Sequence, residues 1–361
     1  MAVTIKKIAE LAGVSVGTVD RALHDRGRVD PKVAQRIKQI AIELNYRPNS
    51  VAKSLSTRNR NLTITVILHV QNMNIFFQDV IDGIKKCKEE IKDFGISVDI
   101  CFCPDFNAEA QLKLIDQAID NGTNAIILVP INSLLIRRRI NQLHAEGFPV
   151  VFMTNIIENT EFLSYVGCDY TLTGRITAGI LNMLRPEGGE LLVFSPSFQM
   201  QGHILRANGL KSELAESYPA IYPHTVYELT GSDIKDYQIT ADALKEHADT
   251  KLIVCPGAYS FGNLQAIQEQ GYLQNAKLIC YDYSDAIGSM IQNREITAAI
   301  TQCPQEQGYT AVKILFEYLS ANKEPRFKHH YIRTRIILKE NLSEIQMTRE
   351  EYRLPDPDQK Q

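Results

Sequence analysis

Short apolar segments alternate with amphipathic helical segments through most of this chain, from residue 63 to residue 301. The apolar segments have the length of strands, and they fall at 63–70, 98–103, 125–130, 150–154, 165–168, 191–195, 252–256, 278–281 and 298–301. Helical segments lie between them, at 76–94, 108–121, 133–146, 171–184, 204–218, 239–246, 261–270 and 286–293. This alternation predicts parallel sheets that are covered by helices on both faces. Because two such series follow one another, we expect two lobes. A ligand site should lie in the cleft between them, beyond the carboxyl ends of the strands.

The composition indicates a folded protein of the cytoplasm. Hydrophobic residues make up 44% of the 361 residues and charged residues 22%, which is enough apolar material for a sizeable core. No apolar run approaches the roughly 18–20 residues that span a bilayer, and the N-terminus lacks the pattern of a secretion signal. The seven cysteines form no CxxC pair, so we expect buried thiols rather than disulfides or a zinc site. They are Cys87, Cys101, Cys103, Cys168, Cys255, Cys280 and Cys303.

The first sixty residues are basic, whereas the rest of the chain is acidic. They hold 12 lysines and arginines against five acidic residues, a net charge of +7 in a chain whose net charge is −3. A basic segment joined to an acidic body is typical of a nucleic-acid-binding module attached to a domain with another task. On charge alone a solvated basic face is the alternative, and the pattern inside the segment argues against it.

The beginning of the basic segment has the pattern of a helix-turn-helix. Thr4 can cap a first helix that carries Ile8 on its apolar face, and Gly13 suits a tight turn that needs a positive φ. Ser15 can cap a second helix of about two turns. A third helix is expected from Pro31 to about residue 44. Residues 51–56 have helical character but are too short to be stable alone in water, so we expect them to order on meeting a partner.

Three short sequence elements in this segment are specific. They are IAELAGVS at 8–15, the pattern Thr18-Val19-x-Arg21, and LNYRPNSVAKSL at 44–55. With them the chain resembles the lac repressor/purine repressor (LacI/GalR) family, and the resemblance extends to about residue 340. It implies an α-helical helix-turn-helix headpiece followed by a two-lobed α/β effector domain with parallel sheets, like a type I periplasmic binding protein.

The resemblance also implies domain boundaries. The headpiece would span 1–48, the hinge helix and linker 49–61, the effector-binding and dimerisation domain 62–340, and a polar, frayed C-terminal tail 341–361. Within the effector domain, lobe one would comprise about 62–168 and 304–322. Lobe two would comprise about 169–303 and 323–340.

By this resemblance the second helix lies in the major groove of a pseudo-palindromic operator, bound by a homodimer. Val16 and Gly17 sit where the family selects bases, and Arg21 suits a bidentate contact with guanine. Phosphate contacts or hinge anchoring are expected of Thr4, Ser15, Thr18, Tyr46 and Asn49. Leu55 matches the hinge leucine that family members wedge into the minor groove, with Lys53 beside it, and the alternative for Leu55 is a buried linker contact. Asp20 departs from the family's usual serine, which predicts an operator unlike those of well-known relatives.

The resemblance places a sugar-like effector between the lobes. Phe76 and Phe77 follow the first strand, where relatives hold a sugar ring between aromatic faces. The polar groups expected to bind its hydroxyls are Asp169, Arg206, Asp282 and Gln302. The alternatives are that the two phenylalanines are ordinary core residues, and that Asp169 forms a structural ion pair with Arg175.

One departure concerns the pocket. Pro256-Gly257 stands where relatives often carry a polar pair, which leaves the sugar, and even the class of effector, open. Tyr259 nearby could compensate.

The sequence predicts a regulator rather than an enzyme. It contains no HExxH, GxSxG, P-loop or strand-following GxGxxG motif, so we expect no catalysis, no cofactor and no metal. The expected function is a repressor of a carbohydrate-utilisation operon, and without a C-terminal heptad repeat a dimer is favoured over a tetramer. Two alternatives stay open: the same fold sensing a purine co-repressor or a partner protein, and a sugar-binding module with no role on DNA.

Overall fold

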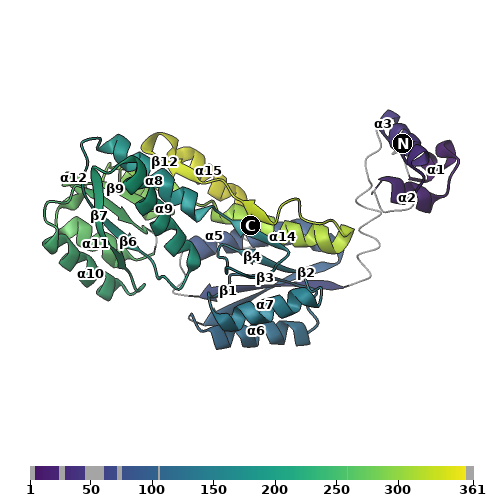
Figure 1. The fold of residues 1–361 in the computed structure, drawn as a ribbon, viewed down its shortest axis with the longest axis horizontal. Coiled ribbons are helices and arrows are strands. Elements are labelled where there is room, and N and C mark those ends of the chain that lie inside the picture. Colours follow the sequence, from purple (N-terminus) through teal and green to yellow (C-terminus); the bar gives the residue numbers. More distant parts are fainter. Residues whose placement is uncertain are drawn as a thin grey trace, which may run out of the picture. The chain divides into compact units, whose positions relative to one another are not determined.

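The structure is a computed structural model, and it describes residues 5–23, 29–44, 61–70, 75–104, 106–257 and 259–354. The chain divides into two compact units, residues 1–59 and residues 60–361. The first is helical, and the second is built from helices and sheets (Figure 1). Within the described residues, no helix combines the length and the apolar character needed to cross a membrane.

The described part of the first unit forms the predicted helix-turn-helix and third helix. These are α1 (Ile5–Ala12), α2 (Val16–Leu23) and α3 (Pro31–Glu43). Ile8, Val19 and Ile37 come from the three helices and are fully buried in their shared core. Gly13, at φ 70°, makes the turn between α1 and α2. Asp30 caps α3, because its Oδ1 accepts a hydrogen bond from the backbone N–H of Lys32 at 2.9 Å.

The second unit contains two six-stranded sheets, and each is the centre of one lobe. The sheet of lobe one has the order β11-β5-β4-β3-β1-β2, with all its pairs parallel. Its strands are β1 (Leu62–Val70), β2 (Ile96–Pro104), β3 (Ala125–Leu128), β4 (Val150–Met153), β5 (Ser164–Gly167) and β11 (His329–Tyr331). Its helices are α5 (Ile75–Ile91), η1 (Lys92–Phe94), α6 (Ala108–Asp120), α7 (Leu134–Ala145) and α14 (Pro304–Ala321).

The sheet of lobe two has the order β12-β10-β9-β8-β6-β7, and its only antiparallel pair in the described chain is β10 with β12. Its strands are β6 (Gly189–Ser195), β7 (Ile221–Glu228), β8 (Leu252–Cys255), β9 (Lys277–Tyr281), β10 (Ala298–Thr301) and β12 (Arg335–Ile337). Its helices are α8 (Tyr170–Leu184), α9 (Gln201–Ser217), α10 (Asp233–Glu246), α11 (Phe261–Glu269), α12 (Tyr272–Asn275), α13 (Asp285–Gln292), η2 (Lys339–Asn341) and α15 (Leu342–Tyr352).

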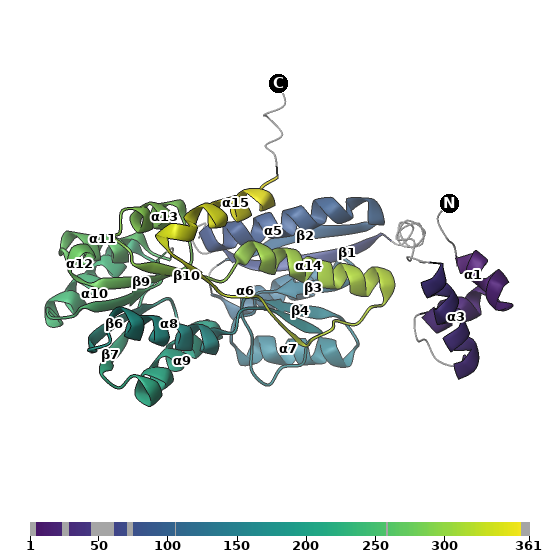
Figure 2. The same ribbon diagram turned by 90° about the horizontal axis from the view of Figure 1, so that it is seen from above.

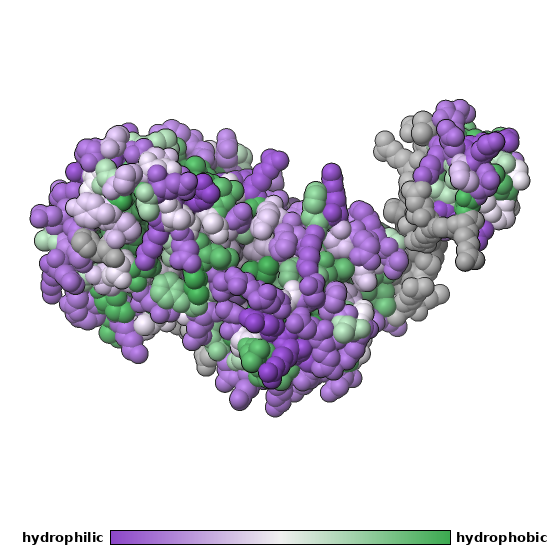
Figure 3. Space-filling model, in the orientation of Figure 1, coloured by the Kyte–Doolittle hydropathy of each residue, from purple (hydrophilic) through white to green (hydrophobic). Residues whose placement is uncertain are grey.

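Each sheet separates two apolar cores, as expected for sheets covered on both faces. In β1, Ile64 and Val66 face the core made with α5 and α14, whereas Ile67 faces the core made with α6 and α7. The two faces of the other sheet pack on α8 and α9, and on α10, α11 and α13. Around these cores, most of the surface visible in Figure 3 is hydrophilic, with apolar side chains in smaller patches.

The third passage between the lobes lies later in the chain than the sequence suggested. Residues 323–331 were expected in lobe two, but β11 pairs with β5 at the edge of the first sheet. Ile332 follows in the core of lobe one, and its backbone N–H donates to the carbonyl of Gly167 at 2.8 Å. The polar segment His329–Tyr331 gives no apolar run, so the edge strand is not visible as a strand in the sequence.

Several elements of the second unit were missed or shortened by the sequence analysis. The edge strand β7 escaped because Pro223 interrupts its apolar pattern, which an edge strand tolerates. Helix α14 had not been assigned, and α10 begins at Asp233 rather than near residue 239.

The prediction of a frayed C-terminal tail is wrong for the first half of that segment. Residues 342–352 form α15, whose Leu342 and Ile345 are buried in the core of lobe two. Only two buried apolar residues one turn apart anchor this helix, Met347 is exposed and most of the remaining residues are polar, so the sequence resembles a tail. The later part of the expected tail, from residue 355, lies outside the described residues.

Six of the seven cysteines are buried, as predicted, and all seven carry free thiols. Cys101 is the exception, since it is partly exposed on β2.

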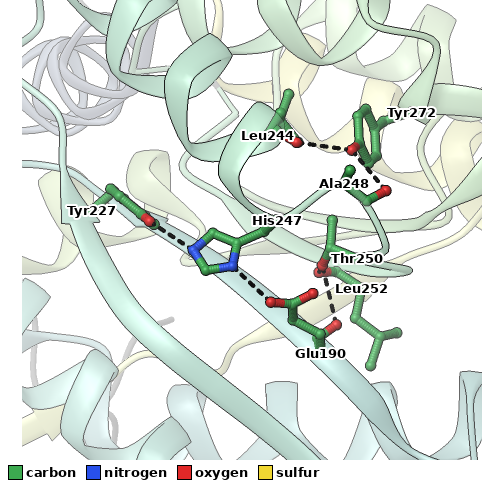
Figure 4. A network of polar contacts seen from close by, with 8 residues as sticks. All are labelled: Glu190, Tyr227, Leu244, His247, Ala248, Thr250, Leu252 and Tyr272. Carbon is green, nitrogen blue, oxygen red and sulfur yellow. Dashed lines mark hydrogen bonds and ion pairs between the residues drawn. The ribbon is translucent and has the colours of Figure 1, made fainter.

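A hydrogen-bonded network centred on His247 ties lobe two together (Figure 4). The Nδ1 atom of His247 lies 2.7 Å from Oε1 of Glu190, and Nε2 lies 3.1 Å from the hydroxyl of Tyr227. Thr250 donates to the carbonyl of Glu190 at 3.1 Å, and the Tyr272 hydroxyl donates to the backbone at the end of α10. The network joins β6, β7 and α10, so it supports the lobe as a structural element.

Candidate functional site

A pocket lies between the two lobes, where strands of both sheets end. The space between its walls, open solvent at the mouth included, is about 870 Å³. Both lobes contribute aromatic and polar side chains. The lining residues are His69, Phe76, Phe77, Phe106, Thr154, Tyr170, Pro196, Met200, His203, Arg206, Gly231, Pro256, Tyr259, Asp282 and Gln302.

Arg206 is the buried cation of this pocket, with 5% of its surface exposed. Its guanidinium carbon lies 4.0 Å from the ring centre of Tyr281 and 5.0 Å from that of Tyr170. Its Nε and Nη2 atoms make no hydrogen bond to any described residue. Burial alone would lower the pKa of Arg206, but the groups around it, Tyr281 foremost, raise it. The pocket therefore holds a permanent cation whose donors are available to a ligand.

Two glycines fix the position of Arg206. A Cβ atom on Gly174 of α8 would collide with the backbone carbonyl of Arg206, and one on Gly209 of α9 would collide with the carbonyl of Thr171. Both glycines let α8 and α9 approach closely, so Gly174 has a packing role.

Asp282 and Gln302 form the acceptor side of the pocket. Nε2 of Gln302 donates to both carboxylate oxygens of Asp282, at 2.9 and 3.2 Å. Asp282 directly follows β9 and has a φ of 65°, a backbone conformation that is costly for a non-glycine residue and is concentrated at functional sites. Burial raises the pKa of Asp282, and the charge of Arg206 and the bond from Gln302 oppose that rise.

His203 contributes a neutral imidazole. Its Nδ1–H is assigned as the donor to the carbonyl of Ser197 at 2.8 Å, which leaves Nε2 as an acceptor. Burial lowers the pKa of His203 from 6.5 to about 4, and the charge of Arg206 acts in the same direction. At neutral pH the pocket therefore offers an acceptor at this position rather than a second cation.

This low pKa makes His203 a source of acid sensitivity. Below pH 6.5 the unfolded chain takes up a proton at this histidine, whereas the folded protein does so only near pH 4, so the free energy of unfolding falls across this interval. We expect the histidine to account for a loss on the order of 2–3 kcal/mol between pH 7 and pH 4. Urea unfolding of the H203N variant, whose amide can keep the bond to Ser197, should show a smaller loss than the wild type. Equal losses in the two proteins would contradict this assignment.

Five of the six effector residues predicted from the sequence meet at the pocket. Phe76 and Phe77 line it from lobe one, with their rings 5.4 Å apart and nearly perpendicular. Phe76 is also part of the core of lobe one, so the alternative of a core role holds for it as well. Arg206, Asp282 and Gln302 line it from the side of lobe two.

Asp169 is not among the residues that line the pocket. Its carboxylate accepts a hydrogen bond from the backbone N–H of Leu172 at 2.9 Å and so caps α8. The ion pair suggested between Asp169 and Arg175 is also wrong, because Nε of Arg175 lies 2.7 Å from a carboxylate oxygen of Glu213. The residue after Asp169, Tyr170, is the one that reaches the pocket.

Several residues that line the pocket were not predicted from the sequence, including His69, Phe106, Thr154 and His203. His69 is the second-last residue of β1 and Thr154 directly follows β4, so both are at carboxyl ends of strands. That position was the available signal. Thr154 has a φ of 59°, and its Oγ1 makes no hydrogen bond to a described residue.

The first unit presents the predicted DNA-reading helix on its surface. Val16 is 49% exposed and Gly17 and Arg21 are also exposed on α2, while Val19 is buried beneath them. The backbone N–H of Thr18 donates to Oγ of Ser15 at 3.1 Å, and the two hydroxyls lie 2.9 Å apart, which caps α2. Thr4, Tyr46, Asn49, Lys53 and Leu55 lie outside the described residues.

Comparison with known protein families gives one match in each of the two units. The profile described as "Bacterial regulatory proteins, lacI family" matches residues 4–49, and "Periplasmic binding protein domain" matches residues 64–324. The chain belongs to the lacI family of bacterial regulatory proteins. This assignment makes it a DNA-binding transcription regulator.

Relatives of known function resemble this regulator over nearly its whole length. Catabolite control protein A of Priestia megaterium is 24% identical over 329 residues, covering 90% of this chain and 94% of that protein. The ribose operon repressor of Haemophilus influenzae is 23% identical over 357 residues, covering 94% and 98%. A solved structure of a Caulobacter myo-inositol binding protein superposes with a TM-score of 0.70 at 21% identity, covering 79% of this chain and 95% of that one. The similarity to the solved structure establishes the fold of the second unit.

Proposed function

We propose that this regulator is a homodimeric repressor whose affinity for its operator is controlled by a sugar-like polyol bound between the lobes. The composition of the pocket is the observation that supports a sugar-like effector. It combines donors of Arg206 that have no partner among the described residues, the carboxylate of Asp282 and the aromatic side chains Phe76 and Phe77. Donors and acceptors of this kind suit vicinal hydroxyls, and aromatic faces suit the C–H groups of a sugar ring. The ribose operon repressor among its relatives supports the same class.

Effector binding would act on DNA through the relation between the lobes. Because the pocket is lined from both lobes, a ligand that binds one arrangement more tightly shifts the population toward it. In a dimer this shift would change the separation of the two hinges, proposed at 49–61, and with it the insertion of Leu55 into the minor groove. The repressor would act in the cytoplasm, on a pseudo-palindromic site that matches its two-fold symmetry.

The experiment that tests this proposal is a thermal-shift screen of the full chain against monosaccharides, polyols, sugar phosphates and purines. A ligand at 100 times its Kd should stabilise the protein by about 2.7 kcal/mol, which raises the Tm measurably. We expect a sugar or polyol to produce this shift. The same compound should then change the affinity for DNA fragments that the protein selects from a random library.

The screen also separates the alternatives. Stabilisation by a purine alone would overturn the sugar assignment while keeping the regulator. A sugar that stabilises a protein with no sequence preference on DNA would instead favour a sugar-binding module.

A further inference from the structure

Helix α15 of lobe two also contacts lobe one. Its first turn packs in the core of lobe two, where Leu342 and Ile345 are buried. Its second half lies against α5 of lobe one, and Figure 2 shows α15 between α13 and α5. The helix therefore joins the two lobes at a place separate from the three passages of the chain between them.

Arg349 makes the central contact of this helix. Its Nη2 and Nε atoms lie 2.9 and 3.3 Å from Oδ1 of Asp79 on α5, and its Nη1 lies 2.8 Å from Oδ1 of Asp285 on α13. The side chains of Arg349 and Asp79 are 11% and 6% exposed, whereas that of Asp285 is 78% exposed. The buried ion pair between Arg349 and Asp79 thus joins the two lobes, whereas the exposed ion pair between Arg349 and Asp285 lies within lobe two.

Other contacts of α15 reach lobe one at the same place. Nζ of Lys86 on α5 donates to the backbone carbonyl of Glu351 at 2.8 Å and lies 4.4 Å from the ring centre of Tyr352. The ring of Tyr352 meets that of Tyr309 on α14 edge to face, at 6.1 Å. These contacts are polar or aromatic and lie near the surface, so they can separate more readily than an apolar core.

The contact of Arg349 lies directly behind the effector pocket. Asp79 is one turn after Phe76 on α5, and Asp285 is three residues after Asp282. Phe76 and Asp282 line both the effector pocket and the smaller adjoining cavity that Arg349 also lines. Movement of α5 relative to α13 would therefore move opposite walls of the effector pocket.

We infer that Arg349 is an interlobe latch, a positioning residue that holds the two walls of the effector pocket at the spacing described here. If the lobes separated at this point, Arg349 would leave with lobe two and the carboxylate of Asp79 would lose its hydrogen bonds to that lobe. Charge-assisted hydrogen bonds in a largely buried site stabilise the arrangement in which they form, so the ion pair opposes separation. The other charged groups that act on Asp79 are Asp82 and Arg353. Burial raises the pKa of Asp79 and Arg349 opposes that rise, in keeping with a carboxylate that depends on this partner.

Single-molecule FRET on ligand-free full-length protein tests the latch. Donor and acceptor dyes are placed on cysteines introduced at the exposed positions Gln117 of α6 and Lys245 of α10, with the C101S substitution removing the partly exposed native thiol. Labelled chain is mixed with excess unlabelled chain, so that a dimer carries at most one dye pair. We expect D79N and R349M to raise the population of a second interlobe distance by at least about fivefold over the wild type.

Two variants serve as controls. D285N removes only the exposed contact within lobe two and should leave the distance distribution unchanged. The double variant D79N/R349M leaves no buried charge unpaired, so it keeps the test valid if R349M alone does not fold. Distributions of D79N and the double variant that superpose on the wild type would overturn the latch, as would a change in D285N as large as that in D79N.

A role of the latch in the response to effector rests on the proposed function, but the FRET measurement uses no effector. A negative FRET result with a positive thermal-shift screen would remove the latch and leave the proposed function intact. The opposite pair of results would keep the latch and remove the sugar effector.

Discussion

Replacing Arg206 by methionine should abolish the thermal stabilisation that the effector gives, while the ligand-free protein stays folded. The guanidinium is buried, and two of its nitrogen atoms make no hydrogen bond to a described residue. Hydrogen bonds to a charged group are worth about 1.5–3 kcal/mol each, so losing two of them should weaken effector binding at least 100-fold. The methionine side chain can still pack on Tyr281, and it removes the cost of burying a charge.

The size of this effect can be read directly from melting curves. At a concentration of 100 times the wild-type Kd, stabilisation should fall from about 2.7 kcal/mol to about 0.4 kcal/mol or less. The matched control is R175M, since Arg175 is half-exposed and pairs with Glu213 across the same two helices. We expect the control to keep the full ligand-induced shift. A normal shift in R206M would show that the effector does not engage Arg206, and the pocket assignment would fail.

The helix boundaries of the first unit could be predicted closely because capping and turn residues mark them. Asp30 caps α3 and Gly13 has the positive φ expected of the turn, and both effects are local in sequence. The strands of the second unit were found for a similar reason, since most are short apolar runs between helices.

Elements that depend on contacts across the fold could not be predicted in the same way. The edge strand β11 is polar and is held by backbone hydrogen bonds to β5, which no side-chain pattern records. Helix α15 has two buried apolar residues, and its Arg349, Glu351 and Tyr352 contact the other lobe. Such contacts are visible only once both lobes are in place.

The residues of the candidate effector site likewise separate into those with a signal in the sequence and those that depend on contacts across the fold. Arg206, Asp282 and Gln302 could be predicted from their places relative to strands and from the family resemblance. Asp169 was predicted from the same resemblance, but at the start of a helix its carboxylate has a nearer partner in the backbone N–H of Leu172. His203 carries no sequence signal of its own, because its neutrality and its acceptor result from burial and from the carbonyl of Ser197.

Replacing Arg21 by alanine is expected to weaken binding to the selected operator by about 1–3 kcal/mol and to relax the preference at one base position. Arg21 is exposed on α2, and its Nη2 lies 3.5 Å from the hydroxyl of Thr18, a contact long enough to be exchanged readily for one with DNA. Binding would be measured by fluorescence anisotropy at fixed salt, on the selected fragment and on fragments substituted at each position. Arg36, exposed on α3, provides a charge-matched control in the R36A variant.

The pattern across fragments distinguishes base recognition from a general attraction to phosphate. If Arg21 reads a guanine, R21A should bind the selected fragment and the fragment changed at that one position equally well, while it still discriminates at the others. R36A removes the same charge and should lower affinity for all fragments by a similar factor, with specificity unchanged. A uniform loss in R21A as well would reduce Arg21 to a phosphate contact. Base selection on α2 would then rest on Val16, Gly17 and Asp20, the position at which this chain departs from its family.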